Sequence, residues 1–198
     1  MLKLYYGNIR MVKDQRVFEH WFKKMDSKRK EKILKCKQEA DKQRSLLAGV
    51  LLNYGLTNNR DAEQVFYSIS HSGDYVICAL ANRRVGVDIE NSFRSLFSEE
   101  KSDQRNRIAK KCFTMGESIE FFSRDGEEKI EYLLDLWTKK ESYSKAIGKG
   151  LGIDFSLIDT QEMDKKFWGG WLEKGYYCSL YVENGEFRDM KIQELVSL

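Results

Sequence analysis

The stretch SISHSGDYVICALANRRVGVDIE, Ser68 to Glu90, decides the fold of this chain. Its runs of β-branched and aromatic residues are separated by the turn sequences SGD and NRR, a pattern typical of consecutive antiparallel strands. We therefore predict a β-meander from about Val65 to Glu90. The same stretch contains one of the two histidines of the chain and ends in Asp-Ile-Glu, so it is also a candidate for chemistry.

Helices and further strands are predicted on both sides of this stretch. The predicted helices cover residues 28–37, 42–56, 107–122 and 128–150, and the predicted strands cover residues 2–9, 154–160, 176–183 and 189–196. A helix followed by paired strands occurs twice, with the helices at 43–56 and 138–151. The repeat indicates an α+β fold of two related halves joined near Arg84 to Val87. Chance similarity between two α+β stretches is the alternative.

Composition bounds the class of protein. The chain has 198 residues, 41% of them hydrophobic, and a net charge of +3 that favours no particular partner. From Lys23 to Arg44, ten Lys/Arg against four Asp/Glu give 10 − 4 = +6. This segment is either a solvated helix face or a surface that meets phosphates. The four cysteines lack zinc-ligand spacing, and the chain has neither the apolar core of a signal peptide nor a membrane span. We therefore expect a cytoplasmic protein with no membrane partner.

Asp88 and Glu90 are the first candidate site residues. On a strand they point to one face, while Val87 and Ile89 point to the other. Two neighbouring carboxylates repel each other and need a cation, a lysine or solvent. An edge strand with one wet face is the commoner explanation of an isolated D-x-E.

The segment WTKKESYSK, residues 137–145, is the second candidate. On a helix Trp137, Glu141 and Lys145 recur every four residues and share one face. Glu141 and Lys145 alone would be a routine surface ion pair, but the tryptophan indicates a packed stripe in which charges need partners. A metal for Glu141 and a phosphate for Lys145 would satisfy both.

The third candidate is Ser70-His71-Ser72 at a strand end, where hydroxyls, an imidazole and turn amides suit phosphate oxygens. A serine–histidine hydrolase is disfavoured, because the chain has no G-x-S-x-G and adjacent strand residues point to opposite faces. The combination of carboxylates, phosphate-binding groups and basic helices instead indicates a magnesium-assisted reaction on a pyrophosphate.

These residues resemble the surfactin-synthetase-activating type of 4′-phosphopantetheinyl transferase. The family's G-x-D-x-E strand matches Gly86 to Glu90, and its W-x-x-K-E-[SA]-x-x-K helix matches Trp137 to Lys145. Its Gly-x-Gly-[LI] element matches Gly148 to Leu151, its S-H-S segment matches Ser70 to Ser72, and its upstream arginine and inter-motif glutamate match Arg44 and Glu117. The resemblance implies an α+β fold of two similar α/β halves packed as an intramolecular pseudo-dimer, in a monomer. The halves would be residues 1–84, on the coenzyme A side, and 85–198, with the metal and catalytic motifs.

The resemblance also implies an activity and roles for residues. The protein would transfer the 4′-phosphopantetheine arm of coenzyme A to a serine of an apo acyl or peptidyl carrier protein, as a holo-[acyl-carrier-protein] synthase does, and release 3′,5′-ADP. Asp88, Glu90 and Glu141 would hold Mg²⁺, with Mn²⁺ as the alternative. Glu141 would also be the general base, and Lys145 would bind the pyrophosphate and assist departure of the product. Coenzyme A would be bound by Arg44, Ser70, His71 and Ser72.

The chain departs from the family in one element. The usual Gly-Lys-Pro before the S-H-S strand is missing, and Arg60 is the nearby cation. Binding of the 3′-phosphate would then shift to Lys28 and Lys32, which lie i,i+4 on one helix face; solvated lysines are the alternative.

For the carrier we expect an apolar contact and a basic one. The candidates are Phe93, Leu96 and Phe97 for the apolar contact, and Arg105, Arg107, Lys110 and Lys111 for the basic one. Packing of the aromatic residues under their own loop is the alternative. Rival functions are a nucleic-acid binder using residues 23–44, a degenerate protein that only binds coenzyme A, and a metal phosphohydrolase. The first leaves the carboxylates unexplained, so we expect no nucleic-acid partner. The third should need more ligands, typically several His and Asp, whereas the chain has two histidines.

Overall fold

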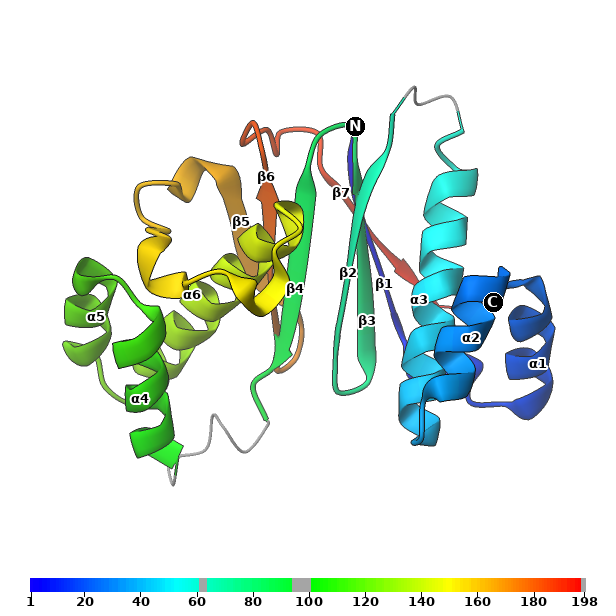
Figure 1. Ribbon diagram of the computed structural model, residues 1–198, viewed down its shortest axis with the longest axis horizontal. Coiled ribbons are helices and arrows are strands. Elements are labelled where there is room, and N and C mark those ends of the chain that lie inside the picture. The colour runs from blue at the N-terminus through cyan, green and yellow to red at the C-terminus, as the bar shows by residue number, and fades with distance from the viewer. Residues whose placement is uncertain (61–63, 94–100, 197–198) are drawn as a thin grey trace. The chain divides into compact units, whose positions relative to one another are not determined.

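The computed structural model describes residues 1–60, 64–93 and 101–196, and it confirms the α+β class (Figure 1). Its first half contains β1 (Leu2–Asn8), α1 (Gln15–Lys24), α2 (Ser27–Lys35), α3 (Glu39–Thr57), β2 (Phe66–Ser72) and β3 (Tyr75–Ala81). Its second half contains β4 (Val85–Asn91), α4 (Ser102–Cys112), α5 (Met115–Phe122), α6 (Gly126–Ala146), β5 (Phe167–Glu173), β6 (Tyr176–Val182) and β7 (Lys191–Leu195). Short 3₁₀ turns lie at Ile9–Val12, Gly150–Gly152, Phe155–Leu157 and Asp164–Lys166.

The chain forms two compact units. One contains Met1–Arg83 together with Phe187–Leu198, and the other contains Arg84–Glu186. The change of unit therefore falls between Arg83 and Arg84, beside the expected junction. The expected halves, 1–84 and 85–198, differ from these units at the C-terminal end, because β7 pairs in parallel with β1. Whether the halves are separate domains stays a prediction.

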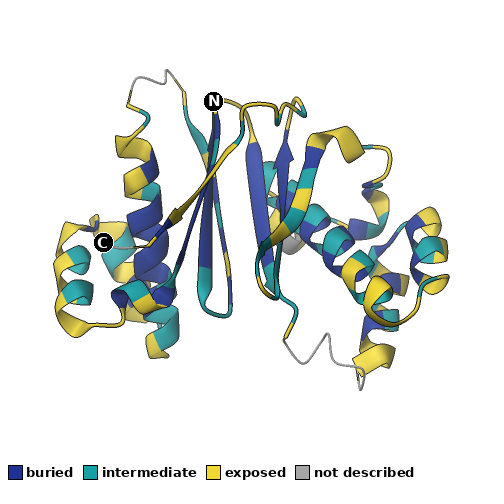
Figure 2. Cartoon of the chain, turned by 180° about the vertical axis from the view of Figure 1, so that it is seen from behind, coloured by how far each residue is buried: buried dark blue, intermediate teal, exposed yellow. Residues whose placement is uncertain are grey.

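The first unit is a four-stranded sheet with α3 packed on it. The strand order is β2-β3-β1-β7, and β2 and β3 form an antiparallel hairpin. The hairpin turn contains Gly73, whose φ of 53° is favourable for glycine. α3 buries Leu46, Leu47 and Leu51 in the core. Figure 2 shows the inner strands as mainly buried. The residues of α2 are mostly exposed.

The second unit is the sheet β4-β6-β5, with α6 packed against β4 and β6. β4 pairs with β6, so the predicted three-stranded meander is wrong in its third strand, although all three strands exist. Local sequence predicted the strands, but the hydrogen-bond partner of β4 comes from residues 176–182. The thiols of Cys78 and Cys178 are fully buried, and burial raises the pKa of each to about 12.

Other sequence predictions also differ from the structure. Residues 154–160 contain a 3₁₀ turn at Phe155–Leu157 rather than a strand, because Asp154 accepts a hydrogen bond from the Ser156 amide and bends the chain. The strand β5, FWGGWLE, was missed because two glycines interrupt its pattern. The predicted helix over 107–122 is divided at Phe113, since Thr114 caps a new helix in a capping box with Glu117.

Among the described residues, no helix combines the length and the apolarity that a membrane crossing requires.

Candidate active site

The candidate site lies where β4 crosses α6, and Gly86 permits that crossing. A methyl group on Gly86 would overlap the carbonyl oxygen of Ser142 and lie 2.7 Å from the amide nitrogen of Ala146. The G-x-D-x-E motif therefore requires glycine at this position for a steric reason, because the backbone of the strand contacts the backbone of the helix there. Strand alternation then directs Asp88 and Glu90 to the same face as Gly86, the face that α6 covers.

Asp88 and Lys145 form an ion pair across this contact. Lys145 Nζ lies 2.6 Å from Asp88 Oδ1, and the side chains are 28% and 7% exposed. Val87 and Ile89 are buried on the opposite face of β4, as the alternation predicted. Asp88 and Lys145 are 57 residues apart in the sequence, and the two motifs thus meet through their charged side chains.

Glu141 lies one helical turn before Lys145 on the same stripe of α6. Burial raises the pKa of the Glu141 carboxyl, and the negative charge of Asp88 raises it further, with a smaller contribution from Glu90. Lys145 acts in the opposite direction. The carboxylates of Asp88 and Glu90 therefore act electrostatically on Glu141, and the proton affinity of Glu141 is increased.

A complete three-ligand metal cage is not assembled in the part of the chain that the structure describes. The donor set nevertheless fits Mg²⁺, which takes oxygen ligands and typically uses one or two carboxylates with substrate phosphates and waters. Asp88 and Glu141 offer such oxygens from two rigid elements. The assignment of Asp88, Glu90 and Glu141 as metal ligands stays a prediction.

A buried ion pair supports the helix just before Glu141. Lys140 Nζ lies 2.7 Å from Glu117 Oε2, and both side chains are 0% exposed. The Lys140 ammonium also donates to the carbonyls of Phe155 and Ile158, and Glu117 accepts hydrogen bonds from Thr160. The sequence analysis matched Glu117 to a glutamate of the family but assigned it no role. In the structure the Glu117 side chain is one half of a buried ion pair that stabilises the packing of α6.

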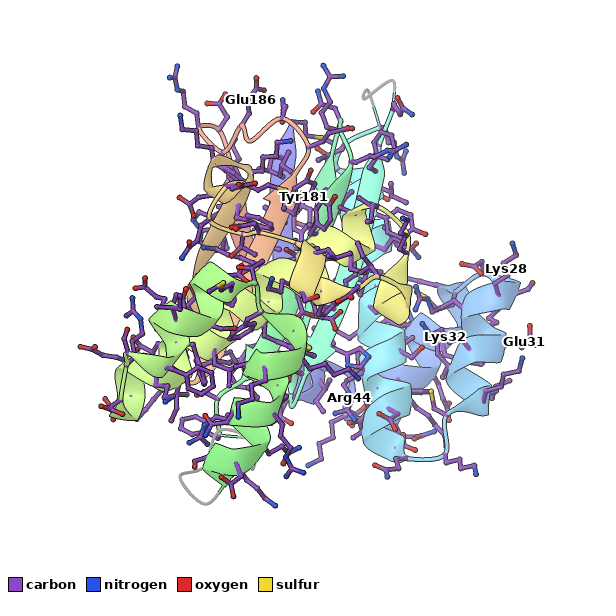
Figure 3. The ribbon with its side chains drawn as sticks, turned by 60° about the vertical axis from the view of Figure 1, so that its left-hand side comes forward. Lys28, Glu31, Lys32, Arg44, Tyr181 and Glu186 are labelled. Carbon is purple, nitrogen blue, oxygen red and sulfur yellow. The ribbon has the colours of Figure 1, made fainter. Side chains whose placement is uncertain are left out.

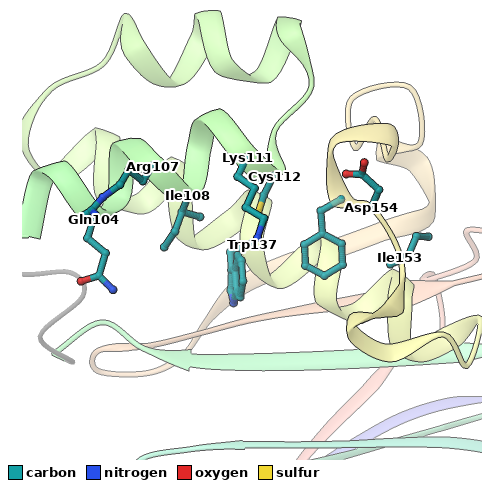
Figure 4. Close-up of a pocket in the computed structure, with 9 residues that line it drawn as sticks. Gln104, Arg107, Ile108, Lys111, Cys112, Trp137, Ile153 and Asp154 are labelled. Atoms are coloured by element: carbon teal, nitrogen blue, oxygen red, sulfur yellow. The ribbon is translucent and has the colours of Figure 1, made fainter.

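A cavity of about 800 Å³ opens beside this support (Figure 4). Its apolar lining is Ile108, Trp137, Ile153 and Phe155, and its basic lining is Arg107 and Lys111 on α4. Trp137 packs edge-on against Phe155, with ring centroids 5.8 Å apart. The predicted packing of the Trp137–Glu141–Lys145 stripe is thus confirmed at its tryptophan end.

The other predicted binding residues belong to the first unit. Arg44, on α3, donates to the Gly73 carbonyl in the β2–β3 turn at 2.8 Å and pairs with Asp41 at 2.6 Å. Ser70 and Ser72 are buried, whereas His71 is exposed, in agreement with strand alternation. Arg44 is therefore placed against the turn that follows the S-H-S segment.

Lys28 and Lys32 are exposed on α2, one turn apart, and Glu31 is exposed on the same helix (Figure 3). Their side chains come from a different helix than Arg44 (Figure 3). Their role in binding coenzyme A stays a prediction.

The structure changes the expectation for one of the residues predicted to meet a carrier. Arg105 is buried, with 6% of its surface exposed, so it does not belong to an exposed basic surface. Phe93 is 70% exposed and lies against Gly175. Leu96 and Phe97 lie outside the described residues.

Comparison with known proteins gives a family. A sequence model of the 4′-phosphopantetheinyl transferase superfamily matches residues 84–191, the segment that contains β4, α6 and the charged residues between them. The chain belongs to the 4′-phosphopantetheinyl transferase superfamily.

Individual members of this superfamily are similar over parts of the chain. The 4′-phosphopantetheinyl transferase gsp of Aneurinibacillus migulanus is 32% identical over 152 residues, which cover 68% of this chain and 60% of gsp. The 4′-phosphopantetheinyl transferase Sfp of Bacillus subtilis is 32% identical over 108 residues, 54% of this chain and 44% of Sfp. The holo-[acyl-carrier-protein] synthase of Streptococcus sanguinis is 41% identical over 68 residues, 34% of this chain and 53% of the synthase.

The family prediction made from the motifs is thereby confirmed, and the Sfp and gsp matches support the predicted type of 4′-phosphopantetheinyl transferase. The chain spans about half the length of these curated relatives.

Proposed function

We propose that this protein transfers the 4′-phosphopantetheine group of coenzyme A to a serine hydroxyl of an apo carrier protein and releases 3′,5′-ADP. The observation that carries the proposal is the cluster of Asp88, Glu141 and Lys145 at the β4–α6 crossing, in a chain of this superfamily. The carrier would belong to fatty-acid, polyketide or nonribosomal-peptide synthesis. The nucleophile comes from the carrier, which accounts for a site built from carboxylates and a lysine.

Each residue has a defined task in the proposed reaction. Glu141 accepts the proton of the carrier serine, and the raised pKa of its carboxyl favours that role. The serine oxygen forms a bond to the phosphorus that carries pantetheine, and the bond from that phosphorus to the 3′-phospho-AMP oxygen breaks. Lys145 donates to the pyrophosphate oxygens and compensates the charge of the leaving group. Asp88, Glu90 and Glu141 would hold Mg²⁺, which supplies further charge neutralisation when it is bound.

The cavity next to Glu141 suits the organic part of this substrate. It has an apolar wall of Trp137 and Phe155 and begins one helical turn from Glu141. A pantetheine arm is an extended chain with apolar and amide segments, which is the kind of ligand that such a wall accommodates. Binding of the other end of coenzyme A would rest on Arg44 and on Ser70 to Ser72.

Asp88→Ala and Glu141→Ala are each expected to reduce transfer by about 10²-fold or more, because each removes a charged group that acts on the reacting pyrophosphate. The measurement is intact-mass spectrometry of several apo carriers incubated with the protein, coenzyme A and Mg²⁺. A gain of one phosphopantetheine group, lost in both variants, supports the proposal. Binding of coenzyme A without any transfer would instead identify a degenerate coenzyme A-binding protein.

The basic face of α4 is proposed to meet acidic residues of the carrier. Arg107 and Lys111 are exposed and lie i,i+4 on this helix. The double variant Arg107→Glu/Lys111→Glu is expected to raise the carrier KM about tenfold or more, because charge reversal repels an acidic partner. Lys165→Glu/Lys166→Glu, also exposed in the second unit, is the matched control and should leave this KM near the wild-type value. An unchanged KM in the α4 variant would refute this carrier surface.

A further inference from the structure

The ion pair between Lys145 and Asp88 occupies an atom that the proposed reaction needs. Lys145 Nζ is 2.6 Å from Asp88 Oδ1, a short charge-assisted contact, and the Asp88 side chain is 7% exposed. A contact that is shielded from water to this degree is screened less than an exposed surface pair. The ion pair therefore stabilises the state in which Lys145 contacts Asp88.

Both side chains have other partners in the proposed reaction. Asp88 would be a ligand of the divalent cation, and Lys145 would bind the pyrophosphate. An ammonium group at hydrogen-bond distance covers one carboxylate oxygen and places a positive charge where a cation would have to come, so the two positive groups compete. In agreement with this, the described residues contain no set of three carboxylates that converges on a cation position.

Lys145 is also placed to move. It lies in the last turn of α6, is more exposed than Asp88, and has a long flexible side chain. The helix ends one residue later at Ala146, and Gly148 follows with a φ of 72°. A change of side-chain rotamer is therefore sufficient to take the ammonium from Asp88 to a neighbouring anion, without a movement of the helix.

We propose that Lys145 takes the place of the divalent cation at Asp88 until the pyrophosphate of coenzyme A draws the ammonium away, so that cation and substrate bind cooperatively. This inference rests on the proposed function and adds a binding order to it. Since coupling between two ligands is reciprocal, coenzyme A tightens the cation and the cation tightens coenzyme A by the same factor. Lys145 would thus weaken the binding of metal ions to Asp88 when coenzyme A is absent.

The test measures binding of Mn²⁺, with free Mn²⁺ followed by electron paramagnetic resonance, with and without saturating coenzyme A. Wild-type protein should bind Mn²⁺ weakly alone and at least about tenfold more tightly with coenzyme A. Lys145→Met, which removes the competing charge, should bind Mn²⁺ alone at least about tenfold more tightly than wild type, and coenzyme A should tighten this binding by a smaller factor than in wild type. Lys149→Met, an exposed lysine one turn further, should behave as wild type.

Other results would overturn the inference in distinguishable ways. If Lys145→Met binds Mn²⁺ alone no more tightly than wild type, while the wild-type protein modifies a carrier, the competition is refuted and the transferase function stands. If wild-type protein neither binds Mn²⁺ with coenzyme A nor modifies any carrier, the proposed function fails as well. Lys145→Gln serves as a second variant if the methionine variant does not fold, and Asp88→Asn should weaken the site in every condition.

Discussion

Gly86→Ala is expected to destabilise the protein by about 3 kcal/mol or more, with loss of whatever activity the site has. The added methyl group would overlap the carbonyl oxygen of Ser142 and approach the Ala146 amide nitrogen to 2.7 Å. Neither atom belongs to a flexible side chain, so relief requires α6 to move away from β4. That movement would also separate Lys145 from Asp88.

Urea unfolding followed by circular dichroism measures this effect, and Gly152→Ala is the matched control. Gly152 is exposed, and a methyl group there would meet no atom within 4 Å. Its substitution should change the free energy of unfolding by less than about 0.5 kcal/mol. Equal stability of Gly86→Ala and wild type would show that the crossing is looser than the structure indicates.

Lys140→Met is expected to lower the free energy of unfolding by about 3–5 kcal/mol, because it leaves the carboxylate of Glu117 buried without its counter-ion. Both side chains are 0% exposed, and their charged atoms are 2.7 Å apart. Glu117 also accepts hydrogen bonds from Thr114 and Thr160, and Lys140 donates to the carbonyls of Phe155 and Ile158. Burial lowers the pKa of Lys140, and Glu117 opposes that shift. The pair therefore holds α5, α6 and residues 155–160 together only while both partners are present.

A double-mutant cycle tests this coupling. Lys140→Met with Glu117→Gln removes both charges, so the double variant should lose clearly less stability than the sum of the two single variants. Lys149→Met, which removes an exposed lysine, should be close to wild type. Additive losses in the cycle would show that the two side chains do not stabilise the fold as a pair.

Much of the fold was predictable from local patterns. The strands around Ser68 and the helix carrying Trp137 follow from residue periodicity, and Asp26, just before α2, caps that helix. The secondary-structure predictions failed where the local sequence pattern and the tertiary packing favour different structures. β5 contains two glycines, and residues 154–160 look like a strand although their carbonyls are used by Lys140.

The candidate site was also only partly predictable from the sequence. Strand alternation predicted that Asp88 and Glu90 share a face, and helical spacing predicted that Glu141 and Lys145 share a stripe. The sequence did not indicate that Lys140, one residue before Glu141, would be a fully buried cation, because its partner Glu117 lies on another helix. It also did not indicate that Lys145 would contact Asp88 directly.

The sequence by itself determined the α+β class, the family and the residue types of the site, because these depend on periodicity and on short motifs whose spacing is fixed along the chain. Only the tertiary structure decided which strand β4 pairs with and why residue 86 is glycine. It also decided which lysine is paired at the site and which is buried for support. These features depend on contacts between segments far apart in sequence, and backbone approach and burial are properties of the packed pair rather than of either segment.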